Sequence, residues 1–158
     1  MKTLLWSLIV ACALVSAPAH AQNNSADMNM QILRDKLKAD KKVIVAANMQ
    51  LTDGEAKAFW PIYDAYQNDL KAINLRLGNG IVMYADAYAA KTINDDMAKR
   101  LLDESVAIEE SEARLRRDYA TKLMSALPAT KAARYMQIES KIRAAVRYEI
   151  AANIPLVE

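Results

Sequence analysis

Beyond residue 21 this sequence contains neither cysteine nor histidine. The single cysteine, Cys12, and the single histidine, His20, both lie in the first 21 residues. Thiol and imidazole side chains supply much of the nucleophilic, acid–base and transition-metal chemistry of proteins. A protein that loses its first 21 residues therefore lacks the side chains on which most familiar catalytic and metal sites depend.

Residues that interrupt helices are also scarce. The chain has three glycines and four prolines, and no long stretch alternates apolar with polar residues as an amphipathic strand does. Strong helix formers such as Ala, Leu, Met, Lys, Glu and Arg dominate instead. We predict an all-α protein of four main helices, with long second and third helices, arranged as an antiparallel hairpin or an open bundle.

The chain has no large excess of charge of one sign. The formal net charge is +2, with basic and acidic residues interspersed. Such a balance produces no strong field toward nucleic acid or anionic lipid. We therefore expect no nucleic-acid partner.

The first 21 residues have the features of an export signal. Lys2 provides a positive start, an apolar run covers residues 4–15, and Ala19-His20-Ala21 matches the small-x-small rule for cleavage before Gln22. The run is shorter than the roughly 20 apolar residues of a membrane span. We predict cleavage after Ala21 and a periplasmic protein, residues 22–158, forming one all-helical domain without a membrane span; residues 22–27 are expected to be flexible.

Cys12 offers an alternative interpretation of this segment. Residues 8–12, LIVAC, loosely resemble a bacterial lipoprotein cleavage site, at which Cys12 is lipidated. The positive end and the apolar run before it are short for a lipoprotein signal. Cleavage after Ala21 is therefore favoured over a lipid anchor.

Four helices follow from apolar spacing and from start and stop signals. The first is expected from Asp27 to about Asn48, with an apolar face formed by Met30, Leu33, Leu37, Ile44 and Ala47. The second begins at the capping motif Leu51, Thr52 and Glu55, in which Thr52 and Glu55 have capping-box spacing.

The second helix has a nearly unbroken apolar seam at spacings of three and four. The seam comprises Phe59, Tyr63, Tyr66, Leu70, Ile73, Leu77, Ile81, Tyr84 and Tyr88. Gly78-Asn79-Gly80 marks either a break or a kink, and a continuous, kinkable helix is favoured because the seam keeps its phase. A third helix is expected from the cap Asn94 to about Ala126, and a fourth between Pro128 and Pro155.

The sequence around the second helix start resembles a known family. LTDGE at 51–55 is similar to the LTxxQ motif of the Spy/CpxP family of bacterial periplasmic proteins, with Glu55 where the motif has Gln. LPATK at 127–131 occupies the place of the second motif and keeps Leu127. YQNDL at 66–70 and the stretch from Tyr135 to Val157 resemble a subgroup of small exported proteobacterial proteins.

This resemblance implies a fold and a function. The implied fold is an assembly of long antiparallel helices, often a curved homodimer. The implied activity is ATP-independent binding of unfolded or flexible polypeptides, or modulation of the sensor domain of an envelope-stress system. No cofactor and no enzymatic activity are expected.

An aromatic cluster at the start of the second helix is the main candidate binding surface. Phe59, Trp60, Tyr63 and Tyr66 form either ordinary core packing or an apolar patch for a client or partner. Arg143 and Arg147 either surround such a patch or form salt bridges.

Acidic and sulfur-containing residues raise the alternative of a metal-binding protein. Glu109 and Glu112 lie three apart and share a face of the third helix, so that they can share a cation. Pairing of Glu110 with Arg114 and of Glu112 with Arg116 explains the same acids without a metal, and Glu112, close to the apolar seam, needs a partner such as an arginine on another helix. Met28 and Met30, with Met49, could bind Cu(I), although core packing is favoured.

No catalytic residues emerge from the sequence. The serines at 105, 111, 125 and 140 lie in helical patterns without a histidine base, and no nucleophile elbow or phosphate loop occurs. The expected function is a non-enzymatic, Spy/CpxP-like binding protein. The alternatives are a structural or adaptor homodimer without clients, and a metal-binding protein.

Overall fold

The computed structural model describes residues 40–157. The chain divides into two compact units, residues 1–42 and residues 43–158, and the second unit contains the helix bundle. The predicted signal peptide, the cleavage after Ala21, Cys12, the segment 22–27, Met28 and Met30 lie outside the described residues.

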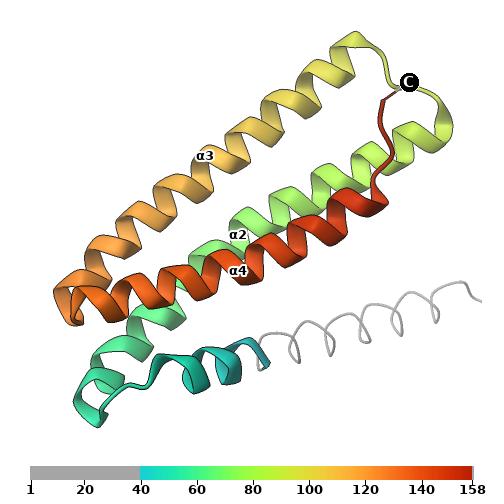
Figure 1. Cartoon of the computed structure of the whole chain (residues 1–158). Helices are drawn as coiled ribbons and strands as arrows, with labels where there is room; N and C mark the ends of the chain where they lie inside the picture. Colours follow the sequence, from blue (N-terminus) through green and yellow to red (C-terminus); the bar gives the residue numbers. More distant parts are fainter. Residues whose placement is uncertain (1–39, 158) are drawn as a thin grey trace, which may run out of the picture. The chain divides into compact units, whose positions relative to one another are not determined.

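Helices account for nearly all of the described chain. Residues 40–49 are helical, and α2 (Asp53–Ala90), α3 (Asp95–Ala126) and α4 (Ala129–Asn153) follow (Figure 1). No strand occurs between residues 40 and 157. The prediction of an all-α fold with long second and third helices is confirmed.

The start of α2 is fixed by the capping box predicted from its sequence. The Thr52 side chain accepts a hydrogen bond from the backbone N–H of Glu55, and the Glu55 carboxylate accepts one from the Thr52 backbone N–H at 2.8 Å. Two of the N–H groups that every helix start leaves without a helical partner are thereby satisfied. Asp53 and Glu55 also place negative charge at the positive end of the helix dipole.

α2 continues through the sequence features that could have ended it. Pro61 lies inside the helix, and Gly78-Asn79-Gly80 is helical throughout. The continuous helix favoured by the apolar seam is therefore the one observed. It ends at Lys91, whose left-handed conformation (φ 55°) closes the last turn with hydrogen bonds to Ala87 and Tyr88.

α3 turns back along α2 after a short connection. Asn94 caps α3 by accepting a hydrogen bond from Met97 N–H at 3.0 Å, as its position predicts. Arg76 of α2 and Glu104 of α3 form a two-pronged ion pair with both contacts at 2.9 Å, and the Tyr119 hydroxyl donates to Asp69 at 2.6 Å. The late part of α2 therefore faces the early part of α3.

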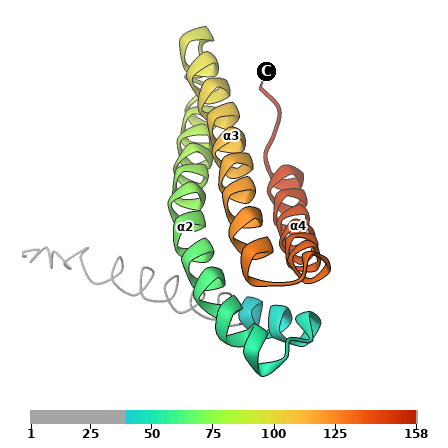
Figure 2. The ribbon, with the colours of Figure 1, turned by 90° about the vertical axis from the view of Figure 1, so that its left-hand side faces the viewer.

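α4 packs beside α3, whereas its backbone stays apart from α2. Leu127 and Pro128 separate α3 from α4, and no Cα atoms of α2 and α4 lie within 8 Å of one another (Figure 2). Long side chains bridge these two helices instead. Since burial depends on how close neighbouring helices come, α4 covers α2 only where such side chains are present.

The core lies where the helical residues 43–49, the first half of α2, the end of α3 and the start of α4 meet. Its buried members are Val45, Met49, Phe59, Tyr63, Tyr66, Leu70, Tyr119, Leu123, Leu127, Ala132 and Tyr135. The predicted face of the first helix is wrong in the described part. Ile44 is 48% exposed and Ala47 is exposed, because Val45 and Met49, one turn apart, provide the larger apolar pair that packs on the aromatic rings.

Candidate functional site

The aromatic cluster, for which the sequence left core packing and a binding patch open, lies in the core. Phe59, Tyr63 and Tyr66 are almost completely buried, and Trp60 is half-buried against the same cluster. Edge-to-face ring contacts join Phe59 and Tyr63 to Tyr135 of α4 at centroid distances of 5.1 and 5.9 Å. These side chains therefore anchor α4 to α2, and an exposed patch is not found at this position.

The two candidate arginines form ion pairs across the α3–α4 interface. Arg147 donates to Glu109 and to Glu112, each at 2.9 Å, and Arg143 lies 3.5 Å from the Glu112 carboxylate. Glu112 is only 7% exposed, so these arginines supply the partner on another helix that its position requires. Glu109 and Glu112 do share a cation, which is the Arg147 guanidinium.

Of the two predicted salt bridges within α3, only one is present. Arg114 pairs with Glu110 at 3.4 Å, as expected for residues four apart. The pairing of Glu112 with Arg116 is wrong, because Glu112 turns toward α4 and Arg116 donates to Ser140 of α4 at 3.3 Å. Because Glu112 is buried against α4, it pairs with the arginines of α4 and not with Arg116.

A second polar contact joins α2 to α4 inside the bundle. Gln67 donates hydrogen bonds to Glu139 at 2.9 Å and to the Tyr135 hydroxyl at 3.2 Å, and Glu139 is 2% exposed. Burial, followed by the nearby Glu139 charge, raises the pKa of Tyr135 well above its usual value. Glu139 is not among the residues predicted from the sequence, although its position between Ile138 and Ile142 in an apolar helical stripe was a usable signal.

The capping motif also takes part in a contact between helix starts. Lys131 of α4 forms an ion pair with Glu55 and donates to the Gln50 carbonyl at 3.0 Å. The hydrogen bond from Lys131, followed by that from the Thr52 backbone, lowers the pKa of Glu55 to about 2. Leu51 packs half-buried against the core.

The apolar seam of α2 is fully buried in its first half and only partly buried in its second. Seam positions up to Leu70 are buried, whereas the later ones, Ile73, Leu77, Ile81, Tyr84 and Tyr88, are only half-buried. On α4 the series Ile138, Ile142, Val146 and Ile150, spaced by four, runs past the same region, and Val146 is 53% exposed. The helical pattern of a core thus continues along a stretch where burial is incomplete.

Two contacts lie at the ends of this partly buried stretch. On the core side, Arg143 donates to the Tyr66 hydroxyl at 3.1 Å, and at the far end the Tyr84 hydroxyl donates to the Pro155 carbonyl at 2.8 Å. We name the residues between them the α2–α4 flank: Leu77, Ile81, Ile142, Val146 and Ile150. Its side chains are aliphatic, so it can take part in apolar contact and not in acid–base chemistry.

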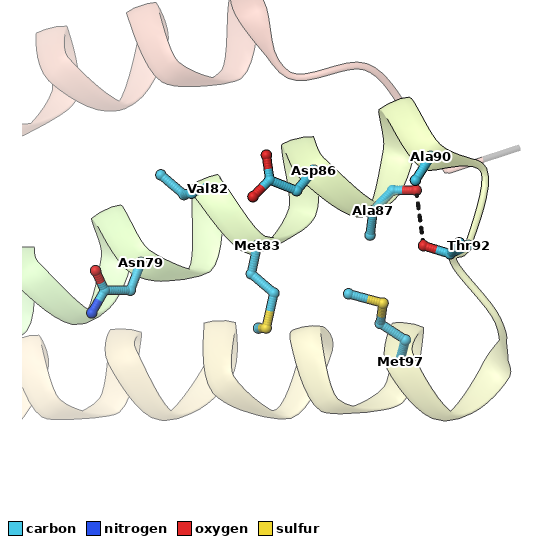
Figure 3. A pocket seen from close by; sticks show the side chains of 8 residues that line it. All are labelled: Asn79, Val82, Met83, Asp86, Ala87, Ala90, Thr92 and Met97. Atoms are coloured by element: carbon cyan, nitrogen blue, oxygen red, sulfur yellow. Dashed lines mark hydrogen bonds between the residues drawn. The ribbon is translucent and has the colours of Figure 1, made fainter. Parts of the chain in front are cut away.

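A shallow groove of about 570 Å³ lies near the turn between α2 and α3. Figure 3 shows Met83 of α2 and Met97 of α3 extending toward one another at its centre. Among the described residues that line the groove, Asp86 is the only ionisable one. These lining residues therefore do not provide the pair of interacting polar groups that a nucleophile or general base requires.

Side chains that were weighed for catalysis or for metal binding lie within helices or in the core. Ser111 and Ser125 donate to backbone carbonyls one turn earlier in α3, at 2.7 and 3.1 Å, which occupies both hydroxyls within the helix. Met49 is buried in the aromatic core. Among residues 40–157 no three His, Cys, Asp or Glu side chains cluster as metal ligands do.

No helix in the described part of the chain is both long and apolar enough to cross a bilayer. No protein-family model, no curated protein and no solved structure matches this chain. The resemblance to the Spy/CpxP family consequently stands on the residues that carry it, above all Leu51, Thr52 and Glu55.

Proposed function

We propose that this protein is a non-enzymatic binding protein that holds flexible polypeptides through the α2–α4 flank. The observation that supports this role is the change in burial along one seam: α2 keeps its apolar spacing to Tyr88, but the seam loses its full cover after Leu70. Exposed apolar surface lowers its free energy when a partner covers it. A periplasmic location and clients of the kind that the Spy/CpxP resemblance implies are part of the same proposal.

The form of the flank favours an extended or helical segment as its occupant. Its α4 residues recur every four positions and form a narrow stripe along one helix, which matches the apolar side of another elongated segment. The stripe is bordered by Arg143 and Arg147, whose charges are already paired with acids of α3. Binding would therefore rest on weak apolar contact and be reversible without nucleotide.

Aggregation of a chemically denatured client, followed by light scattering, tests this proposal. Val146→Asp places a charge on the flank, whereas Tyr148→Asp makes the same change on the opposite side of α4, at a residue that is 72% exposed. Both sites are exposed enough for folding to tolerate the change within roughly 0.5 kcal/mol. We expect wild type and Tyr148→Asp to suppress aggregation and Val146→Asp to lose the effect; equal activity of all three proteins, or none in any, would refute the proposal.

A homodimer is the second candidate function, and the outer face of α2 favours it. Six exposed residues at helical spacing form a stripe: Lys71, Leu75, Gly78, Asn79, Val82 and Asp86. Leu75 and Val82 are 52% and 59% exposed. Read from either end, the stripe has a charged residue, an aliphatic residue and then a small or polar residue. The charges at its two ends are of opposite sign.

This stripe is complementary to a second copy of itself. Two α2 helices that run in opposite directions and cross between Gly78 and Asn79 would bring Lys71 of each copy to Asp86 of the other. The same crossing would place Leu75 against Val82, as an interface with two-fold symmetry requires. Within the described chain neither Lys71 nor Asp86 forms an ion pair, so both remain available.

Charge reversal tests the homodimer by analytical ultracentrifugation. Lys71→Glu and Asp86→Lys each place like charges at both ends of the crossing and should weaken the dimer. The double variant restores opposite charges and should recover dimerisation. A monomeric wild type, or a double variant that is as weak as the single variants, would rule out this interface.

A further inference from the structure

Charge is distributed very unevenly along the helices, although the chain as a whole is nearly balanced. Residues 53–112 contain six basic and twelve acidic residues, whereas residues 114–147 contain nine basic and only two acidic ones. The second segment comprises the end of α3 and most of α4. A concentration of positive charge in an otherwise balanced chain points to a local role for that charge.

Most of these cations have an identified partner. Arg114 pairs with Glu110, Lys131 with Glu55, and both Arg143 and Arg147 with Glu112. Lys122 lies over the Tyr119 ring at 4.0 Å. By contrast, four of these cations form no ion pair with any residue in the described range: Arg116, Arg117, Arg134 and Lys141.

Arg116 and Lys141 face the same groove between α3 and α4. The groove has a volume of about 530 Å³, and its lining comprises Arg116, Met136, Gln137, Ser140 and Lys141. One guanidinium nitrogen of Arg116 donates to the Ser140 hydroxyl at 3.3 Å, which holds the arginine against α4. Every polar side chain of this lining can donate hydrogen bonds, and two of them are cationic.

No carboxylate lines this groove within the described chain, and two acids close to it in the sequence, Glu139 and Glu112, are engaged elsewhere. Glu139 precedes Ser140 but is buried toward α2, where it accepts from Gln67. Glu112 lies one turn before Arg116 and is paired with Arg143 and Arg147. Within residues 40–157, no ion pair therefore neutralises Arg116 or Lys141 at the groove.

We infer that this groove binds a phosphate group, with Arg116, Ser140 and Lys141 as its principal contacts. A guanidinium offers paired N–H donors that match two phosphate oxygens, and an ammonium adds a point charge. The Ser140 hydroxyl and the Gln137 amide can supply further donors. The site is separate from the α2–α4 flank and does not depend on the polypeptide-binding role.

Free phosphate and the phosphate of a lipid headgroup share this chemistry, and two arms of one experiment distinguish them. In the first arm, inorganic phosphate and pyrophosphate are titrated into the purified protein at constant ionic strength, and backbone amide shifts are followed by NMR. In the second, the protein is sedimented with phosphatidylcholine vesicles with and without phosphatidylglycerol. We expect saturable binding in at least one arm, with NMR shifts confined to Arg116 and residues 137–141 where the free ion binds.

Arg117 provides the matched control, since it lies next to Arg116, is exposed and does not line the groove. Arg116→Gln and Lys141→Gln should each weaken binding about tenfold, as expected for loss of a charge-assisted hydrogen bond. Arg117→Gln removes the same charge and should change affinity less than about twofold. Equal weakening by all three substitutions, or no saturable binding in either arm, would overturn the inference.

Discussion

Arg147 on α4 donates a 2.9 Å hydrogen bond to Glu112 on α3, a carboxylate that is 7% exposed. The same guanidinium reaches Glu109 at 2.9 Å, so that one side chain of α4 holds two acids one turn apart on α3. Apolar packing alone only weakly fixes the position of one helix along the axis of its neighbour. This contact assigns one register to α3 and α4, and with it the position of Val146 on the flank.

Glu112→Gln should destabilise the protein by about 2 kcal/mol. Removing one partner of a buried pair costs roughly 3–5 kcal/mol, but the Arg147 side chain is 38% exposed, and water can replace part of the lost contact. Urea unfolding followed by circular dichroism measures the change. Glu110→Gln is the control, because its pair with Arg114 is exposed on both sides and contributes at most about 0.5 kcal/mol; equal losses in both variants would contradict this account of Glu112.

Stability should fall in acid as Glu55 becomes protonated. Its pKa is about 2 in the folded protein against 4.5 for a free side chain, chiefly because of the hydrogen bond from Lys131. A folded-state pKa below the unfolded value stabilises the protein above about pH 4.5, and this contribution is lost as the pH falls toward 2. Lys131→Met should raise the pKa of Glu55, measured by NMR titration, and reduce the pH dependence of unfolding between those values; an unchanged Glu55 pKa would contradict the role of Lys131.

Helix boundaries were largely predictable because they depend on neighbours in sequence. Thr52 with Glu55, Asn94 and Pro128 each mark a helix start that the structure confirms. The side chains available for binding were not predictable in the same way. Tyr63 and Val146 both occupy apolar seam positions, yet Tyr63 is buried and Val146 is 53% exposed, and the path of α4 relative to α2 is one cause of this difference. That path depends on contacts between distant residues, such as Gln67 with Glu139.

Stability should also fall in strong alkali, because several phenols are buried. Burial is the main cause that raises the pKa of Tyr63 and of Tyr119 to about 12. A raised folded-state pKa means that the unfolded chain loses these protons first, near pH 10, so the stabilisation is present below pH 10 and is lost as the pH rises through 12. Tyrosinate absorbance and helical circular dichroism, recorded on the same sample, should show ionisation of these phenols together with loss of helix.

Tyr119→Phe separates the two effects of this residue. The substitution removes the hydrogen bond to Asp69 and should cost about 1 kcal/mol at neutral pH. The substitution also removes a phenol that ionises in alkali, so the loss of stability between pH 10 and 12 should be smaller than in wild type. Ionisation of all phenols near pH 10 in a protein that remains helical would contradict the assignment of these shifts to burial.

Gly78→Ala and Gly80→Ala should each stabilise the isolated chain by about 0.5–1 kcal/mol, since glycine is costly inside a helix. A Cβ built at either position meets no described atom within 4 Å, so nothing in the described chain opposes the added methyl group. The two glycines therefore have no packing role within residues 40–157 of a single copy.

The proposed crossing of two α2 helices would give Gly78 a packing role, because the backbone of the opposing helix approaches it there. Unfolding in urea, measured at protein concentrations well below and well above the dissociation constant of the dimer, distinguishes these cases. The stabilisation that Gly78→Ala gives at low concentration should shrink or reverse at high concentration. An equal gain in stability at both concentrations would remove the reason for a glycine at the crossing.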